Sequence, residues 1–160
     1  MSIVKMGDQV IYSMRQVTVQ DADDLQQMCW SNWSVDSIAE LLMRVDKFMK
    51  QGRGFGIVAY STDAGILGYG QLTVWPRTTE ISDLIVAPAY RERGIGTAII
   101  CALIDKVRSW GLAQVEIGAA LSNPRALLLY QRLGFEEDRT IELDLGKGLE
   151  PVMYLTRQLR

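Results

Sequence analysis

Apolar residues recur at helical spacing in four stretches of this 160-residue chain, and runs of apolar or alternating residues lie between them. The helical stretches are predicted at residues 22–29, 38–49, 96–110 and 126–133. Strands are predicted at residues 11–17, 55–60, 66–75, 81–86, 114–118, 135–145 and 151–159, after a loose lead-in over residues 1–9. The pattern therefore predicts about seven strands and four helices in the order βααβββαβαββ.

Capping and turn residues support these boundaries. The segments Thr18-x-x-Asp21 and Ser37-x-x-Glu40 are typical of capping boxes, which begin helices. Asn123 is a good N-cap, and Pro124 fits the first position of the helix that follows it. No linker or repeat divides the chain, so we expect residues 1–160 to form one domain of the mixed α/β (α+β) class.

Glycines in the predicted strands point to local irregularities. Asp63-Ala64-Gly65 predicts a hairpin between two of the strands. Gly68 and Gly70 interrupt the strand that follows, which indicates either a β-bulge or the close approach of another element. The bulge is the favoured interpretation.

Composition narrows the possible functions. The 48% of hydrophobic and 22% of charged residues are ordinary for a globular domain, and a net charge of −2 argues against non-specific nucleic-acid binding. No apolar run is long enough to span a bilayer, so we expect a cytoplasmic protein that binds no membrane. Two cysteines are too few for a disulfide framework, and Cys101 is expected to be buried within an apolar helical pattern. The chain has no histidine, so proton transfer falls to other groups.

The segment Arg91-Glu92-Arg93-Gly94-Ile95-Gly96-Thr97 lies between a predicted strand and a predicted helix. Its glycines allow a ligand to approach the backbone, and the N–H groups of a helix start favour an anion. The two arginines add charge that can pair with phosphate. The segment thus predicts a phosphate or pyrophosphate cradle, although an ordinary turn with solvated arginines has the same composition. It lacks the Gly-Lys-Ser/Thr of a P-loop, and Ile99 replaces the third glycine of a dinucleotide fingerprint.

Two motifs carry a resemblance to a known family. Arg91-x-x-Gly94-x-Gly96, after the strand Leu84-Ile85-Val86-x-Pro88, resembles the acyl-CoA-binding signature of the Gcn5-related N-acetyltransferase (GNAT) superfamily. Asn123-x-x-Ala126-x-x-x-Tyr130-x-x-x-Gly134-Phe135 is similar to a second segment of that family. The order of elements matches over nearly the whole chain, while the specific motifs lie in the C-terminal half.

The resemblance implies a largely antiparallel central sheet with one splayed parallel pair and about four flanking helices. It also implies transfer of an acetyl group from acetyl-CoA to a primary amine by direct attack, with no metal. The backbone near Ile85 would polarise the thioester, and the pantetheine arm would lie along β-strand 81–86. The residues implied to bind acetyl-CoA are Leu84, Ile85, Val86, Arg91, Arg93, Gly94, Ile95, Gly96, Thr97 and Asn123.

The same resemblance implies two catalytic residues. Tyr130 would protonate the departing thiolate, although a core tyrosine with a satisfied hydroxyl is the alternative. Glu80 would take the proton of the amine directly or through water, although an acid at the start of a strand is often a solvated edge charge. Asp83 is the weaker candidate because strand alternation would place it on the opposite face.

The acceptor amine is not readable from the sequence. In the family, segments equivalent to Trp30–Ser34 and Leu145–Leu149 wall the acceptor site, and Trp33 is either a lining residue or a packing residue. Small amines, antibiotic-like molecules, peptide N-termini and lysine side chains are all open as acceptors, and a homodimer is possible. The alternatives to an enzyme are a non-catalytic acyl-CoA-binding regulatory module and a nucleotide- or phosphate-binding protein that uses the same turn.

Overall fold

A computed structural model describes residues 5–7 and 10–160 of the chain. The strands are β1 (Lys5–Gly7), β2 (Val10–Gln16), β3 (Gly54–Ser61), β4 (Gly65–Val74), β5 (Thr79–Val86), β6 (Gln114–Ala120), β7 (Glu136–Asp144) and β8 (Leu149–Gln158). The helices are α1 (Ala22–Met28), α2 (Val35–Lys50), α3 (Ile95–Ser109) and α4 (Pro124–Arg132), with short 3₁₀ turns at Val19–Asp21 and Pro88–Tyr90. All seven predicted strands and all four predicted helices are present.

One sheet runs through these strands in the order β1-β2-β3-β4-β5-β6-β8-β7. Every neighbouring pair is antiparallel except β5 and β6, which are parallel. The mixed α/β class with a single parallel pair is therefore confirmed. The strand β1 was not predicted, because its three residues are too few to show a period.

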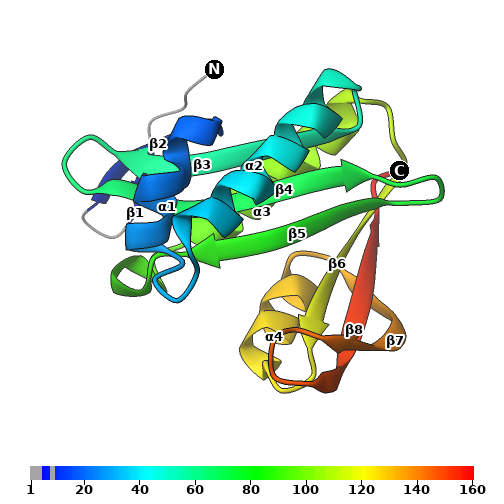
Figure 1. Cartoon of the computed structure of the whole chain (residues 1–160). Coiled ribbons are helices and arrows are strands. Elements are labelled where there is room, and N and C mark those ends of the chain that lie inside the picture. Colours follow the sequence, from blue (N-terminus) through cyan, green and yellow to red (C-terminus); the bar gives the residue numbers. More distant parts are fainter. Residues whose placement is uncertain (1–4, 8–9) are drawn as a thin grey trace.

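Helices cover both faces of the sheet (Figure 1). The helices α1 and α2 pack on one face around Leu25, Ile38, Leu42 and Tyr69. The helix α3 packs on the other face, where its buried residues form one core with residues of α4 and several strands. Burial of these apolar side chains is the main source of the fold's stability.

The glycines of β4 serve both purposes considered above. The register of β3 with β4 shifts between Ala59 and Tyr60, which leaves Leu67 beside Gly68 as an extra residue of β4, and Gly70 lies opposite a bulge of β5. In addition, a Cβ on Gly70 would lie 2.8 Å from Cγ2 of Ile99, and one on Gly68 would lie 2.9 Å from Cδ1 of the same residue. Any side chain at these positions would push α3 away from the sheet.

Two local predictions are wrong. The helix α2 begins at Val35 rather than after Ser37, because the Ser34 side chain accepts a hydrogen bond from the Ser37 N–H and is the N-cap. Cys101 is exposed, because it lies on the solvent side of α3, whereas Cys29 is the buried cysteine. None of the described helices is long and apolar enough to cross a membrane.

Candidate active site

The parallel strands β5 and β6 separate within the sheet. They are in register only at Glu80–Glu116 and Ile81–Ile117, although β5 continues to Val86 and β6 to Ala120. Figure 1 shows the two strands diverging from this point. Because the strands no longer pair there, the second half of β5 has no strand on its β6 side, and Val86 O accepts from the Arg91 side chain instead.

A turn and a helix start lie beside the end of β5. Gly94 adopts a left-handed conformation with φ of 82° and is the N-cap of α3. The N–H of Ala98 donates to Gly94 O at 3.0 Å, so the N–H groups of Gly96 and Thr97 precede the first helical hydrogen bond. These amides carry the positive end of the helix dipole, as the sequence predicts for an anion cradle.

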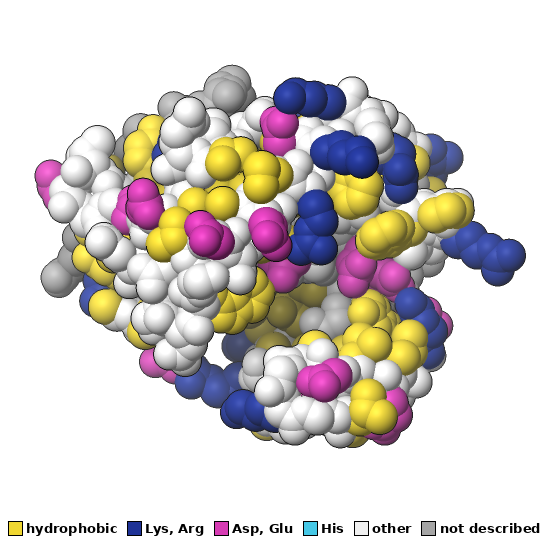
Figure 2. All heavy atoms as spheres, in the orientation of Figure 1, with side chains coloured by type: hydrophobic (Ala, Val, Ile, Leu, Met, Phe, Trp, Pro, Cys, Tyr) yellow, Lys and Arg dark blue, Asp and Glu magenta, His cyan; other side chains and the backbone are white. Residues whose placement is uncertain are grey.

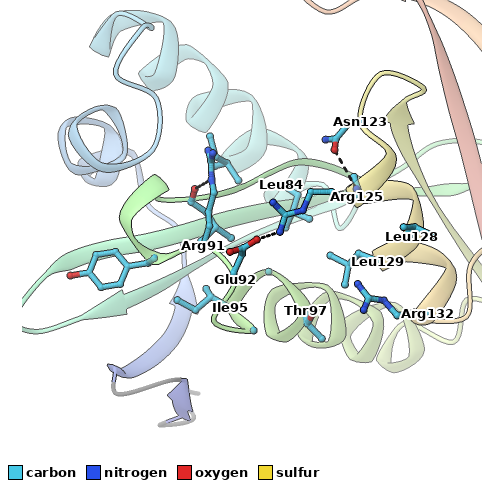
Figure 3. A pocket seen from close by; sticks show the side chains of 16 residues that line it. Leu84, Arg91, Glu92, Ile95, Thr97, Asn123, Arg125, Leu128, Leu129 and Arg132 are labelled. Carbon is cyan, nitrogen blue, oxygen red and sulfur yellow. Dashed lines mark hydrogen bonds and ion pairs between the residues drawn. The ribbon is translucent and has the colours of Figure 1, made fainter.

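A cavity of about 740 Å³ joins the open part of β5 to this helix start. Its lining comprises Leu84, Ile85, Val86, Tyr90, Arg91, Glu92, Gly94, Ile95, Gly96, Thr97, Asn123, Arg125, Ala126, Leu128, Leu129 and Arg132. Figure 3 shows these side chains converging from β5, the cradle turn, α3 and α4. A volume of this size suits a ligand as large as a nucleotide cofactor. The structure thus brings together nine of the ten residues implied to bind acetyl-CoA.

The tenth residue, Arg93, lies apart from the cavity lining. Its guanidinium carbon lies 5.2 Å from the centre of the Tyr90 ring, which is a cation–π contact. Arg91 does line the cavity, but its Nε donates to Val86 O at 3.1 Å. Asn123 is confirmed as the N-cap of α4, since its side-chain oxygen accepts from the Ala126 N–H at 3.3 Å. Asn123 is also among the residues that line the cavity.

Tyr130 lies on α4 inside the core shared with α3. Its side chain is 7% exposed, and its ring centre is 6.3 Å from that of Phe135. Burial raises the pKa of the phenol to about 12, so the hydroxyl keeps its proton at neutral pH. Tyr130 is not among the residues that line the cavity.

Glu80 is held by an aromatic pair at the start of β5. The indole Nε1 of Trp75 donates to one carboxylate oxygen at 2.9 Å, and the hydroxyl of Tyr154 donates to the other at 3.4 Å. Burial raises the pKa of Glu80, and the neighbouring charge of Glu116 raises it further. The carboxyl group is therefore held by two side chains, which differs from a freely solvated edge charge.

The strand β5 carries a bulge at Asp83. Gln71 pairs with Ser82 and Tyr69 pairs with Ile85, so two steps along β4 match three steps along β5 (71 − 69 = 2, 85 − 82 = 3). The extra residue, Asp83, adopts a φ of 52°, which is uncommon for a residue other than glycine. The bulge breaks the alternation of the strand at this position.

As a result, Asp83 shares the face of Glu80, and the expectation that it points to the opposite face is wrong. Burial raises the pKa of Tyr69, which packs against α1 and α2, and the charge of Asp83 raises it further. The charge of Asp83 also contributes to the raised pKa of Glu80. Desolvation raises the pKa of Asp83 itself, while Ser82 and the guanidinium of Arg44 in α2 act in the opposite direction.

Aromatic residues also lie on this side of the sheet. Trp33 is 44% exposed and stacks on Trp30 with a ring-centre distance of 5.2 Å, and Trp30 meets Tyr69 edge-on at 5.6 Å. Leu145 and Leu149, at the turn between β7 and β8, are exposed. Figure 2 shows the surface hollowed between the part that holds α1 and α2 and the part that holds β7, β8 and α4.

Sequence reasoning missed several residues of the site. Glu116 is 4% exposed and accepts from Arg139 at 2.8 Å, while the Arg139 guanidinium lies 4.7 Å from the Tyr154 ring centre. In the sequence, the only indication of this Glu116–Arg139–Tyr154 contact network was that Glu116 lies between apolar residues of β6. Arg125 and Arg132 line the cavity, and their spacing on one helix face could have indicated them.

Comparison with known proteins gives the same family for most of the chain. The acetyltransferase (GNAT) family matches residues 19–135. A glucosamine 6-phosphate N-acetyltransferase of Trypanosoma brucei brucei is 30% identical over 114 residues, which are 66% of this chain and 76% of that protein. An uncharacterized N-acetyltransferase of Bacillus subtilis is 31% identical over 91 residues, 57% of each protein. An uncharacterized N-acetyltransferase of Methanocaldococcus jannaschii is 40% identical over 63 residues, which are 39% of this chain and 28% of that protein.

Solved structures share the fold. A putative acetyltransferase of the GNAT family from Desulfovibrio desulfuricans superposes with a TM-score of 0.75 at 17% identity, covering 93% of this chain and 99% of that one. A putative acetyltransferase of Salmonella typhimurium, solved with acetyl-CoA, superposes with a TM-score of 0.73 at 18% identity, covering 93% and 94%. Together with the match over residues 19–135, this places the chain in the acetyltransferase (GNAT) family.

Proposed function

We propose that the protein transfers an acetyl group from acetyl-CoA to a primary amine by direct attack within a ternary complex. The observation that supports this most is the single cavity that connects the unpaired edge of β5 with the amides at the start of α3. A donor with an extended amide-bearing arm and a diphosphate matches both ends of that cavity. The proposal treats the described residues as one domain, because a single sheet runs through them.

The chain would hold the donor through its backbone. The amides of Gly94, Ile95, Gly96 and Thr97 would receive the diphosphate, and the free edge of Leu84–Val86 would pair with the pantetheine arm. Asn123 would donate its amide N–H to the same arm. A backbone N–H near Ile85 would then point at the thioester oxygen, where negative charge develops during attack.

The remaining chemistry is a pair of proton transfers. Glu80 would accept a proton from the ammonium group, directly or through water, and the amine nitrogen would attack the thioester carbon. The C–N bond forms, the C–S bond breaks, and the electron pair leaves on sulfur. Tyr130 would give its proton to this thiolate, and the second proton of the attacking nitrogen would pass to the phenol oxygen, directly or through water, so that no phenolate is left.

The face that the acceptor would approach carries the carboxylates Glu80 and Asp83. A positively charged amine is attracted to such a face, whereas a phosphorylated sugar is repelled. We therefore favour a cationic amine over glucosamine 6-phosphate, the acceptor for which the Trypanosoma relative is named. A peptide N-terminus and a small polyamine both satisfy this requirement.

The test has two steps. Calorimetry measures acetyl-CoA binding, and a thiol-release assay then follows turnover with spermidine, an N-terminal alanyl peptide, a lysyl peptide and glucosamine 6-phosphate. The expected result is micromolar to submillimolar binding with release of thiol for at least one cationic amine. Absence of binding at millimolar acetyl-CoA would end the proposal.

A second function has one observation in its favour. Tyr130 lies in the core rather than on the cavity wall, which is also what a non-catalytic acyl-CoA-binding regulatory module would show. Tight CoA binding with no thiol release for any amine of the panel would support that alternative.

A further inference from the structure

Two arginines of α4 line the cavity but take no part in the mechanism above. Arg125 and Arg132 are seven residues apart (132 − 125 = 7), which is close to two helical turns, so they lie on the same face of α4. In Figure 3, Arg125 reaches from α4 toward the cradle turn, and Arg132 points toward the first turns of α3. Both guanidinium groups therefore border the region beside the proposed diphosphate position.

Arg125 is already engaged by an acid of the cradle turn. Its guanidinium forms an ion pair with the carboxylate of Glu92, which joins α4 to the turn across the cavity (Figure 3). The two side chains are 78% and 66% exposed, so water and salt weaken this pair. A phosphate dianion offers Arg125 a stronger, charge-assisted partner and can displace Glu92.

The two arginines of the segment 91–97 are held close to that segment and to the end of β5. Arg91 lines the cavity with its Nε bound to Val86 O, and Arg93 stacks on Tyr90 and is not among the lining residues. Coenzyme A carries a phosphomonoester on its ribose in addition to the diphosphate. Of the three arginines that line the cavity, Arg125 and Arg132 of α4 are the two outside the segment 91–97, where the diphosphate is proposed to bind.

We propose that Arg125 and Arg132 bind the ribose 3′-phosphate of coenzyme A, and that Glu92 holds Arg125 over the cavity until the donor replaces it. This inference rests on the proposed function, since it assumes that the donor is an acyl-CoA. In this proposal, helix α4 is the element that selects coenzyme A over donors that lack the 3′-phosphate. It also predicts that Glu92 weakens coenzyme A binding whereas the two arginines strengthen it, because the negative charge of Glu92 opposes the phosphate.

The experiment compares the Kd of coenzyme A with that of 3′-dephospho-coenzyme A by calorimetry at low salt. The wild type should bind coenzyme A about tenfold more tightly than 3′-dephospho-coenzyme A. Arg125→Gln should reduce this preference to about twofold, because only the affinity for coenzyme A falls. Arg132→Gln should reduce it in the same direction. Glu92→Gln should tighten coenzyme A binding by about two- to threefold, because Arg125 is released and a negative charge is removed.

Arg108→Gln is the matched control. Arg108 is also exposed and also pairs with a single acid, Asp105, but it lies in the last turn of α3 away from the cavity lining. This variant should keep the wild-type preference. Melting temperatures of all variants check that the fold is retained.

The outcomes separate this inference from the proposed function. If the wild type binds neither ligand, the proposed function fails. If it binds both with equal affinity, or if Arg125→Gln and Arg132→Gln keep the wild-type preference, only the phosphate assignment fails. If Glu92→Gln weakens coenzyme A as Arg125→Gln does, the ion pair is a structural support and the displacement by the donor is refuted.

Discussion

Replacement of Gly96 by alanine should affect stability and donor binding in opposite directions. Gly96 lies in the first turn of α3 and is not among the glycines with positive φ. A Cβ at this position would meet Val86 Cγ2 at 3.5 Å, which is an ordinary van der Waals contact. The protein itself therefore has no need for a glycine here. The added methyl group would instead project into the cavity that Gly96 lines.

The magnitudes follow from these contacts. Alanine in place of an unstrained helical glycine adds about 0.5–1 kcal/mol to the free energy of unfolding, or about 1–4 °C in melting temperature for a chain of this size. The methyl group would move the diphosphate off the amides and cost at least one charge-assisted hydrogen bond of about 1.5–3 kcal/mol. The Kd of acetyl-CoA should therefore rise by about 10- to 100-fold.

Calorimetry and thermal unfolding measure the two quantities on the same samples. Gly54→Ala serves as the control, because its Cβ would lie 2.7 Å from the Cβ of Phe48, far along the chain from the cavity lining. That variant should lower the melting temperature and leave the Kd unchanged. A Gly96→Ala protein that is more stable yet binds acetyl-CoA as the wild type does would refute the cradle.

Three further predictions concern the proton-transfer side of the site. Tyr130→Phe should lower kcat by about 100-fold in the thiol-release assay with little change in the Kd of acetyl-CoA, and an unchanged kcat would remove the phenol from the mechanism. Glu80→Gln should lower kcat by about 100-fold or more and abolish the acidic limb of the kcat–pH profile. In the wild type that limb should lie above the ordinary glutamate pKa of 4.5, because the pKa of Glu80 is raised. The raised pKa means that the folded state favours the unionised carboxyl of Glu80. This group therefore stabilises the fold at acidic pH, and the stabilisation is lost as the pH rises through the pKa of the folded state. Urea unfolding should show Glu80→Gln to be at least as stable as the wild type at neutral pH. Asp83→Asn keeps a residue that tolerates the left-handed conformation, so the melting temperature should change little while the KM for a cationic amine rises by about three- to tenfold; an unchanged KM would give Asp83 a purely conformational role.

The sequence by itself determined the elements and the turn that is proposed to bind the donor. Helical and strand periods are local, so they predicted all four helices and the seven longer strands. The cradle is also contiguous, because Gly94 and Gly96 lie between one strand and one helix. Asn123 and Pro124 similarly mark the start of α4 without reference to any other segment. These features depend on neighbours in the chain, which the sequence displays directly.

The tertiary structure decided what distant segments place together. Glu80 meets Tyr154 and lies beside Glu116 because of the register of β5 with β6 and of β6 with β8, which no local pattern specifies. The one-residue bulge placed Asp83 on the face of Glu80, since a shift of one position reverses the side chains of a strand. The ion pair of Arg125 with Glu92 joins segments 33 positions apart. Such contacts arise from the packing of the sheet, and sequence periods report only which face of an element is buried.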